Sequence, residues 1–395
     1  MTLRRIAALL IGLCLAAAPL TAQDSGPSLA QLTATAQEGD AQAQFALGMR
    51  YHEGNGVLQN FAEAARWFAQ AAGQGHPQAQ NLLGQYYHSG LGVDQDSATA
   101  LRWLEAAAAS GEPHFLHDLA VTLETGPEGQ ADPNRAAALY TRAAGQGHLE
   151  SIVSLGVLYQ NGKGVPRDPA RAKALYETAA NQGHARALNN LGLLYVRGEG
   201  VTQDYEHAVT LFSAAAEQGL AVAMTNLGVM YANGFGVPVD EAYAAELYRM
   251  GGRGADPVAA AGIGPVYDPR LSAPDTTETG LKRLRQGVAA GDPVAQFQAG
   301  WLILSREDIG IEEQIEAAQL MSGAAKAGFS PAMVNLALLY LEGQGVPQDY
   351  VLAHMWMIRA GSAGQPEVPG LSARLLSRMT PDQINEAQTR AAQPR

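Results

Sequence analysis

From residue 39 onward, apolar and small residues recur with helical spacing in blocks that end at glycine-containing turns. Between residues 183 and 219, a first apolar stripe falls at i, i+4, i+7 and i+8, on one face of a helix, and consists of Ala187, Leu191, Leu194 and Tyr195. After a turn, a second stripe consists of Ala208, Leu211, Phe212, Ala215 and Ala216. The pattern predicts two helices that pack against each other and are joined by a short turn.

This helix pair is one copy of a 36-residue repeat. Its register is marked by glycines that stand 36 residues apart, at Gly39, Gly75, Gly111, Gly147, Gly183 and Gly219. Most copies also keep a Leu-Gly pair, a tyrosine and a Gly-x-Gly-Val turn, which in one copy are Leu191-Gly192, Tyr195 and Gly198–Val201. Because these positions keep one register, we predict a stack of similar units, each of which buries the apolar face of its neighbour.

Several positions in each copy have a local structural reason. Gly198 is predicted to end the first helix, since glycine adopts left-handed dihedral angles at little cost. Asp204 is predicted to begin the second helix, where a carboxylate accepts hydrogen bonds from the first-turn N–H groups. Small residues such as Gly192 and Ala208 allow the helices to approach closely. The large residues beside them, such as Phe212, are expected to fill the core and not to bind a cofactor.

The register divides the chain into nine units, six of them regular, with flanking segments. The third unit, from Gly111, has drifted and has Gly126-Pro127 at its turn. Two further units are degenerate, because Gly264-Pro265 interrupts a predicted helix and the next unit lacks its Gly-x-Gly turn. The C-terminal residues are predicted to form a helix that begins at Thr380-Pro381 and caps the array. The predicted segments are a signal peptide (1–22), a leader (23–38), repeats 1–6 (39–254), degenerate repeats 7 and 8 (255–327), repeat 9 (328–364) and the capping helix (365–395).

These units resemble Sel1-like repeats, relatives of the tetratricopeptide repeat, over about residues 39–364. The resemblance rests on the Leu-Gly, Tyr, Gly-x-Gly-Val and Ala positions that keep one register. It implies an all-α fold, a right-handed superhelical solenoid of about nine helix–turn–helix repeats that binds proteins along its inner face. The exported bacterial members that the chain resembles include inhibitors of sensor kinases and scaffolds for polysaccharide export or envelope assembly.

The first 22 residues have the features of a secretory signal peptide. Arg4 and Arg5 precede an apolar run, Ile6–Ala18, and the small residue Ala22 stands before a polar stretch. The run is shorter than the ~20 residues that span a bilayer; an uncleaved anchor is the alternative, and the exact cleavage site stays open. Cleavage would remove Cys14, the one cysteine, which suits an oxidising compartment. We therefore expect a periplasmic protein with no transmembrane segment after signal removal.

Composition excludes several classes of protein. The chain has 47% hydrophobic and only 16% charged residues, so it can bury a large core and is not globally disordered. Its net charge of −12 argues against nucleic-acid binding, which needs clustered Lys and Arg. A single cysteine excludes a disulfide framework and Cys-based metal sites.

Catalytic and metal-binding motifs are also missing from the sequence. There is no Gly-x-Ser-x-Gly elbow, phosphate-binding loop or His-Glu-x-x-His pair, and the Gly-x-Gly pairs stand between helices, where no dinucleotide fold is implied. His76, His148 and His184 follow the marker glycines and belong to the repeat itself. His114, His117 and Asp118 form a group without a third ligand nearby, so a structural role is favoured over a metal site. We expect no enzyme activity, no cofactor and no metal.

Candidate binding residues lie on the first helix of each unit, at positions that the core does not use. Position seven after the marker glycine is asparagine in three regular units, and an amide with two donors and an acceptor can hold the backbone of an extended peptide. The alternative is that these amides cap or bridge neighbouring helices. The predicted partner-binding residues are Asn190, Asn226, Asn335, Arg50, His52, Gln85, Tyr86, His88, Gln160 and Arg197.

Two functions follow from these observations. The first is an exported, non-enzymatic scaffold or adaptor that binds a protein or peptide partner in the superhelical groove, as a regulator of an envelope sensor or a part of envelope or polysaccharide assembly. The alternative is an envelope hydrolase or a glycan-binding module that uses the degenerate region 255–327, where function can displace the repeat consensus.

Overall fold

The computed structural model describes residues 27–126, 131–255, 264–306, 308–366 and 368–394. Every regular element within these ranges is an α-helix, so the fold is all-α as predicted. The predicted signal peptide lies outside the described residues. The helices of the leader and of repeats 1–6 are α1 (Leu29–Gln37), α2 (Ala41–Glu53), α3 (Phe61–Gly73), α4 (Pro77–Ser89), α5 (Ser97–Ala108), α6 (Pro113–Thr125), α7 (Pro133–Ala144), α8 (Leu149–Asn161), α9 (Pro169–Ala180), α10 (Ala185–Arg197), α11 (Tyr205–Glu217), α12 (Ala221–Asn233) and α13 (Glu241–Ala255).

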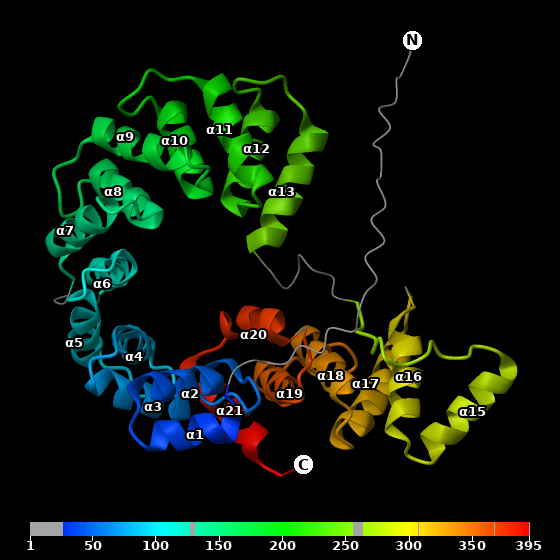
Figure 1. Ribbon diagram of the computed structural model, residues 1–395. Helices are drawn as coiled ribbons and strands as arrows, with labels where there is room; N and C mark the ends of the chain where they lie inside the picture. Colours follow the sequence, from blue (N-terminus) through cyan, green and yellow to red (C-terminus); the bar gives the residue numbers. More distant parts are fainter. Residues whose placement is uncertain (1–26, 127–130, 256–263, 307, 367, 395) are drawn as a thin grey trace, which may run out of the picture.

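Helices α2 to α13 form successive antiparallel pairs that stack into an arc (Figure 1). The first helix of a pair lies on the inner side of the arc, as α8 and α10 do, and the second lies on the outer side, as α7 and α9 do. From α2 to α13, consecutive helices pack on each other. The arrangement is the solenoid that the 36-residue register predicts.

The helix ends are satisfied by the residues that the sequence indicates. Gly198 ends α10 in the left-handed conformation, with φ 68°, and its N–H donates to the carbonyl of Leu194. The Asp204 carboxylate caps α11 by accepting from the N–H of His207 at 2.9 Å. The same aspartate N–H donates to the carbonyl of Tyr195, which closes the Gly-x-Gly-Val turn.

Small residues set the distance between the two helices of a pair. Gly192 on α10 faces the ring of Phe212 on α11, and a Cβ added at Gly192 would lie 2.7 Å from that ring. Ala208 and Phe212 are 0% and 1% exposed. These residues therefore form the core, as predicted for the small and large positions of the repeat.

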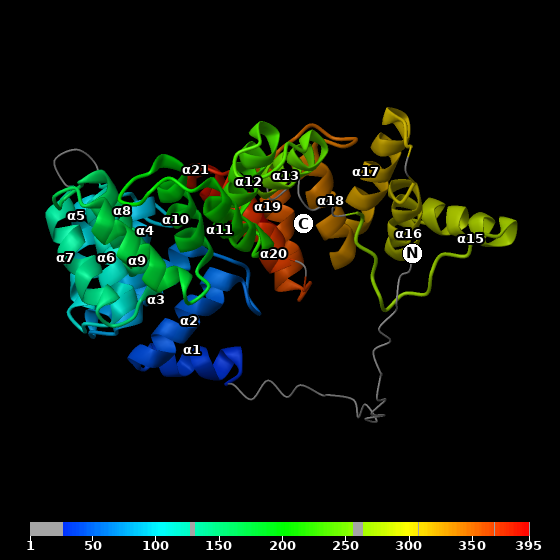
Figure 2. The same ribbon diagram turned by 90° about the horizontal axis from the view of Figure 1, so that it is seen from above.

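The C-terminal part continues the helical architecture. Its helices are α15 (Glu278–Ala289), α16 (Pro293–Leu304), α17 (Ile311–Lys326), α18 (Ser330–Glu342), α19 (Tyr350–Ser362), α20 (Val368–Leu376) and α21 (Pro381–Ala392). Residues 264–276 belong to no helix, in agreement with the interruption predicted at Gly264-Pro265. α21 begins after Thr380, which caps it, so the predicted start of the last helix is present. Figure 2 shows α15 at the opposite end of the molecule from α5 and α7.

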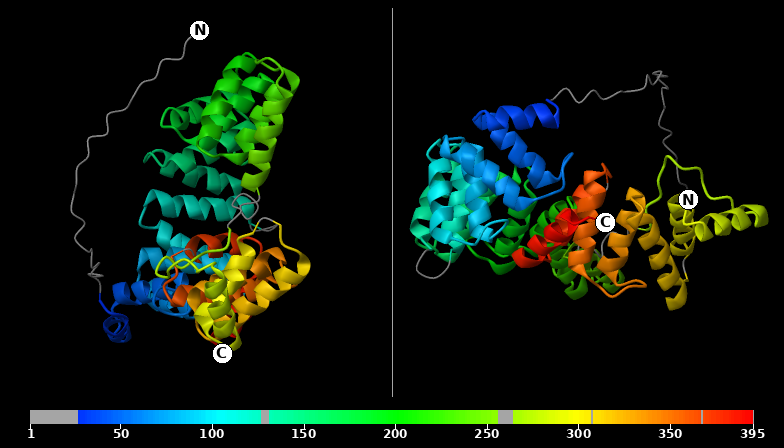
Figure 3. Two further views of the ribbon diagram at one scale, coloured as in Figure 1. Left: turned by 90° about the vertical axis from the view of Figure 1, so that its right-hand side faces the viewer. Right: turned by 90° about the horizontal axis from the view of Figure 1, so that it is seen from below.

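The last helices return to the first repeat. Gln388 on α21 accepts a hydrogen bond from the N–H of Phe61, the first residue of α3, at 3.0 Å. Phe61 is 1% exposed and belongs to one apolar cluster with Trp356 on α19 and Ile384 on α21. Figures 1 and 3 show the C-terminal helices beside the first repeats. The C-terminal helix thus contacts the beginning of the array and also packs on α19.

Candidate functional site

The candidate site is a row of polar side chains on the first helices of repeats 2 to 6, here called the inner row. Its members are Asn81, His117, Asp118, His148, Glu150, Ser151, His184, Asn189, Asn190 and Asn226. Asn226 on α12 donates its amide to Oδ1 of Asn189 on α10 at 2.8 Å. Asn81 on α4 makes the equivalent contact with Oδ2 of Asp118 on α6 at 2.7 Å. In both pairs, position six of one repeat bonds to position seven of the next. The row therefore links neighbouring repeats at a fixed spacing.

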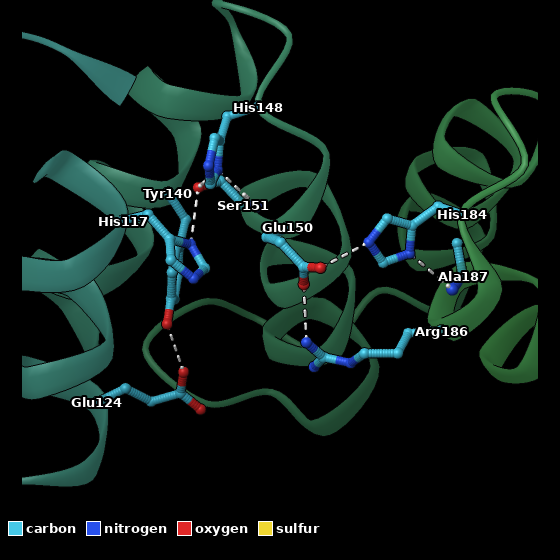
Figure 4. Close-up of polar contacts among 9 residues, drawn as sticks. All are labelled: His117, Glu124, Tyr140, His148, Glu150, Ser151, His184, Arg186 and Ala187. Atoms are coloured by element: carbon cyan, nitrogen blue, oxygen red, sulfur yellow. Dashed lines mark hydrogen bonds and ion pairs between the residues drawn. The ribbon is translucent and has the colours of Figure 1, made fainter. Parts of the chain in front are cut away.

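Histidines occupy the middle of the inner row. His117 on α6 and His148, the N-cap of α8, lie with ring centroids 5.0 Å apart (Figure 4). The Ser151 hydroxyl stands between them, 3.0 Å from Nδ1 of His117 and 2.9 Å from Nδ1 of His148. Burial lowers the pKa of both histidines, and for His117 the nearby His148 lowers it further. The lowered pKa values favour the neutral ring, which can both donate and accept a hydrogen bond.

The next histidine joins α8 to α10. Nδ1 of His184 caps α10 by accepting from the N–H of Ala187 at 3.3 Å, and its Nε2 lies 2.9 Å from Glu150 (Figure 4). Arg186 bonds to the second oxygen of Glu150 at 2.8 Å. Burial raises the pKa of Glu150, but the bonds to His184 and Arg186 outweigh it and leave the pKa lowered. The carboxylate is consequently held ionised between two repeats.

Tyrosines of the second helices also form hydrogen bonds with polar side chains of the first helices. The Tyr140 hydroxyl donates to Glu124 at 3.0 Å (Figure 4), and the Tyr176 hydroxyl donates to Gln160 at 2.9 Å. Burial raises the pKa of both tyrosines. They therefore act as donors that orient the polar side chain at position 13 of their own repeat.

The three predicted asparagines have different surroundings. Asn190 is half-buried and its Oδ1 accepts from Asn189 at 3.3 Å. Asn226 is half-buried and bonds to Asn189, as described above. Asn335 is 1% exposed, and its amide bonds to the backbone of Val266. The bridging role is therefore present for Asn226, and the backbone-holding role is present for Asn335 within the chain itself.

The other predicted residues divide by exposure. Gln85 and Arg197 are exposed; Arg50, His52, His88 and Gln160 are half-buried; and Tyr86 is 2% exposed. The structure brings together Nδ1 of His52 and the Tyr86 hydroxyl, at 2.7 Å, and Gln85 and Asp118, at 3.0 Å. Tyr86 packs edge-on against Phe61 and Phe68, so its ring belongs mainly to the core. Partner binding by these residues stays a prediction.

The sequence analysis did not identify Asn81, Ser151 and Asn189 of the inner row, and it considered Asp118 only as part of a histidine group. Asn81, Asp118 and Asn189 stand at position six or seven, so the register of the repeat is the signal that could have identified them. Position six varies among asparagine, histidine, threonine and apolar residues, so no single residue type marks it. The bond between position six and position seven of the next repeat becomes visible only when the stacking offset is known.

Among the described residues, no group of three or more His, Cys, Asp or Glu is placed to hold a metal ion. Within the same part of the chain, no helix combines the length and apolar character that a membrane span requires.

Comparison with known proteins gives consistent results. The Sel1 repeat profile matches seven stretches, at residues 41–76, 77–112, 113–148, 149–184, 185–220, 221–256 and 330–365. The chain is similar to a Sel1 repeat protein from Oxalobacter formigenes, with 28% identity over 54% of this chain and 86% of that chain and a TM-score of 0.51. It is also similar to a protective antigen present in uropathogenic Escherichia coli strains that displays an SLR fold, with 28% identity over 93% and 94% of the two chains and a TM-score of 0.43. No curated protein sequence matches the chain.

Proposed function

The chain belongs to the Sel1 repeat family, and we propose that it is an exported scaffold that binds a protein partner along the inner row of repeats 2 to 6. Solenoids of this family typically serve as non-catalytic scaffolds for protein–protein interaction. The finer proposal, that the inner row holds the partner and that the protein works outside the cytoplasm, goes beyond the family.

The observation that carries the binding proposal is the organisation of the inner row. Its side chains are positioned by bonds between repeats, such as Asn226 to Asn189 and His184 to Glu150. Side chains that are already ordered lose little entropy when a partner binds, and such preorganisation favours affinity. The half-buried Asn190 and the exposed Gln85 keep surface that a partner can reach. The row therefore offers both donors and acceptors along one line.

The test compares two pairs of asparagines. The variant Asn190→Ala with Asn226→Ala removes two amides of the inner row, whereas Asn181→Ala with Asn233→Ala removes two exposed amides at the ends of α9 and α12. In-cell cross-linking followed by purification is expected to recover a dominant partner with the wild type and the second variant. Recovery with the first variant should fall at least tenfold. Equal recovery with both variants, when both are folded, would show that the inner row does not hold the partner.

Export has its own test because the one cysteine lies in the predicted signal peptide. Cleavage near Ala22 would remove Cys14 and leave a chain without a thiol. The denatured protein purified from cells should therefore not react with a maleimide, and its mass should correspond to a chain that begins near Gln23. A full-length mass with one maleimide added would contradict processing.

A further inference from the structure

A short segment of the chain, Gly264–Asp268, lies on the helices of repeats 8 and 9 without forming a helix itself. The Val266 N–H donates to Oδ1 of Asn335 on α18 at 2.8 Å, and Nδ2 of Asn335 donates to the Val266 carbonyl at 2.8 Å. One side-chain amide thus satisfies both backbone groups of one residue. We call Gly264–Asp268 the docked segment.

The geometry of these bonds is that of peptide recognition. The N–H and C=O of one residue point to the same side only when the backbone is extended, as in one residue of a β ladder. Nε1 of Trp301 on α16 also donates to the carbonyl of Pro265 at 3.0 Å. Three backbone groups in succession are therefore held by side chains from α16 and α18, and these bonds do not depend on the identity of the bound residues.

Tyr267 adds an aromatic anchor to the backbone contacts. Its ring lies 4.6 Å from the ring of Trp301 and 5.6 Å from that of Phe297, centroid to centroid. Its hydroxyl accepts from Nε2 of Gln298 at 3.0 Å. The carboxylate of Asp268 forms an ion pair with Arg270, two residues later, at 2.9 Å. Its charge is therefore paired within the segment and not with a residue of α16 or α18. Val266 also packs against the apolar cluster of these helices. The side-chain contacts therefore favour an apolar residue followed by a tyrosine.

The residues that hold the docked segment are register equivalents of the inner row. Gln298 and Asn335 stand seven residues after Gly291 and Gly328, the same position that Asn190 and Asn226 occupy in repeats 5 and 6. Trp301 stands at position ten. In this part of the molecule, position seven therefore contacts a segment of the chain itself.

We infer that the face of α16 and α18 is a second peptide-binding site, occupied by the docked segment as an internal ligand, and that an extended peptide with an apolar residue followed by tyrosine binds there in its place. A tethered ligand acts at a high effective concentration, so an external peptide binds weakly until the docked segment leaves. The site is distinct from the inner row of repeats 2 to 6, and the inference stands without the proposed function.

The test opens the site and supplies the ligand from outside. In the variant Val266→Pro with Tyr267→Ala, the docked segment loses its N–H donor and its aromatic anchor. A fluorescent peptide with the sequence of residues 264–271 should bind this variant at least tenfold more tightly than the wild type. Adding Asn335→Ala should abolish the gain, whereas adding Asn233→Ala, at an exposed amide, should not. A peptide with alanine in place of tyrosine should not bind.

Three results would overturn the inference. Failure of the folded, opened variant to bind the peptide would make the docked segment a permanent structural part. A gain that Asn190→Ala with Asn226→Ala removes, and Asn335→Ala does not, would place the peptide in the inner row instead. If the opened variant does not fold, hydrogen exchange on the wild type decides: saturating peptide should accelerate exchange of the Val266 amide, and unchanged exchange would exclude displacement.

Discussion

Gly200 lies directly against the backbone of Pro169, the first residue of the second helix in the preceding repeat: a Cβ at Gly200 would lie 2.8 Å from the carbonyl carbon of Pro169. The second glycine of the turn makes the same contact in other repeats, for example Gly236 with Tyr205. Gly56, in the first repeat, has no neighbour within 4 Å of the added atom. The glycine therefore serves the stacking of repeats as well as the shape of the turn.

This relationship predicts different costs for two equivalent substitutions. Gly56 and Gly200 have φ 72° and 70°, so alanine at either position should cost about 1 kcal/mol of unfolding free energy from left-handed strain. Gly200→Ala should cost about 1–3 kcal/mol more, because the methyl group overpacks against Pro169. Urea unfolding measures both variants. Equal losses would show that the turn alone requires glycine.

The fold was largely predictable because its determinants are local and repeated. The left-handed turn at Gly198, the cap at Asp204 and the close approach at Gly192 each depend on one residue type in a fixed register. The contact between Gln388 and Phe61 joins residues 327 apart and leaves no periodic trace in the sequence. The return of the C-terminal helices to the first repeat could therefore not be predicted.

The candidate site was predictable only in part. Position seven could be identified from its asparagines, but the partner of Asn226 is Asn189 in the preceding repeat, which requires knowledge of how repeats stack. The hydrogen-bond partner of Asn335 could not be predicted either, because Val266 lies in a region where the repeat register is interrupted. The sequence predicts which face is polar, whereas the contacts across that face depend on tertiary packing.

The histidine at position one after the marker glycine is predicted to act mainly as a helix cap. His184→Ala removes the acceptor for the Ala187 N–H and should lower the unfolding free energy by about 1 kcal/mol. His184→Asn keeps a short polar cap, like Asp40 at the start of α2, and should restore most of the loss. Thermal unfolding of both variants measures this. A loss of the same size in His184→Asn would show that the bond to Glu150 matters more than the cap.

The contact that joins the two ends of the chain should be visible by hydrogen exchange. Gln388→Ala removes the acceptor for the Phe61 N–H, and the net cost should be about 1 kcal/mol. Exchange of the Phe61 amide should accelerate, while the amides within α9 keep their rates. Asn385→Ala, at an exposed residue of the same helix, is the control. Unchanged exchange at Phe61 in Gln388→Ala would mean that α21 does not protect α3 in solution.

A buried histidine should make stability depend on pH. His354 on α19 is 0% exposed, and neither ring nitrogen has a hydrogen-bond partner among the described residues. Burial lowers the pKa of His354 from 6.5 to about 4. The unfolded chain therefore binds a proton at a higher pH than the folded chain does, so this contribution to stability is complete above pH 6.5. It is lost as the pH falls from 6.5 toward 4, by about 3 kcal/mol in total.

The variant His354→Leu separates this effect from the acid sensitivity of other groups. Leucine has no proton to gain and no buried polar atom to satisfy, so the variant should lose less unfolding free energy than the wild type between pH 7.5 and pH 4.5. His207→Leu, at an exposed histidine, should follow the wild-type profile. Urea unfolding at a series of pH values gives the three curves. Parallel curves for the wild type and His354→Leu would show that His354 is protonated in the folded protein at no extra cost.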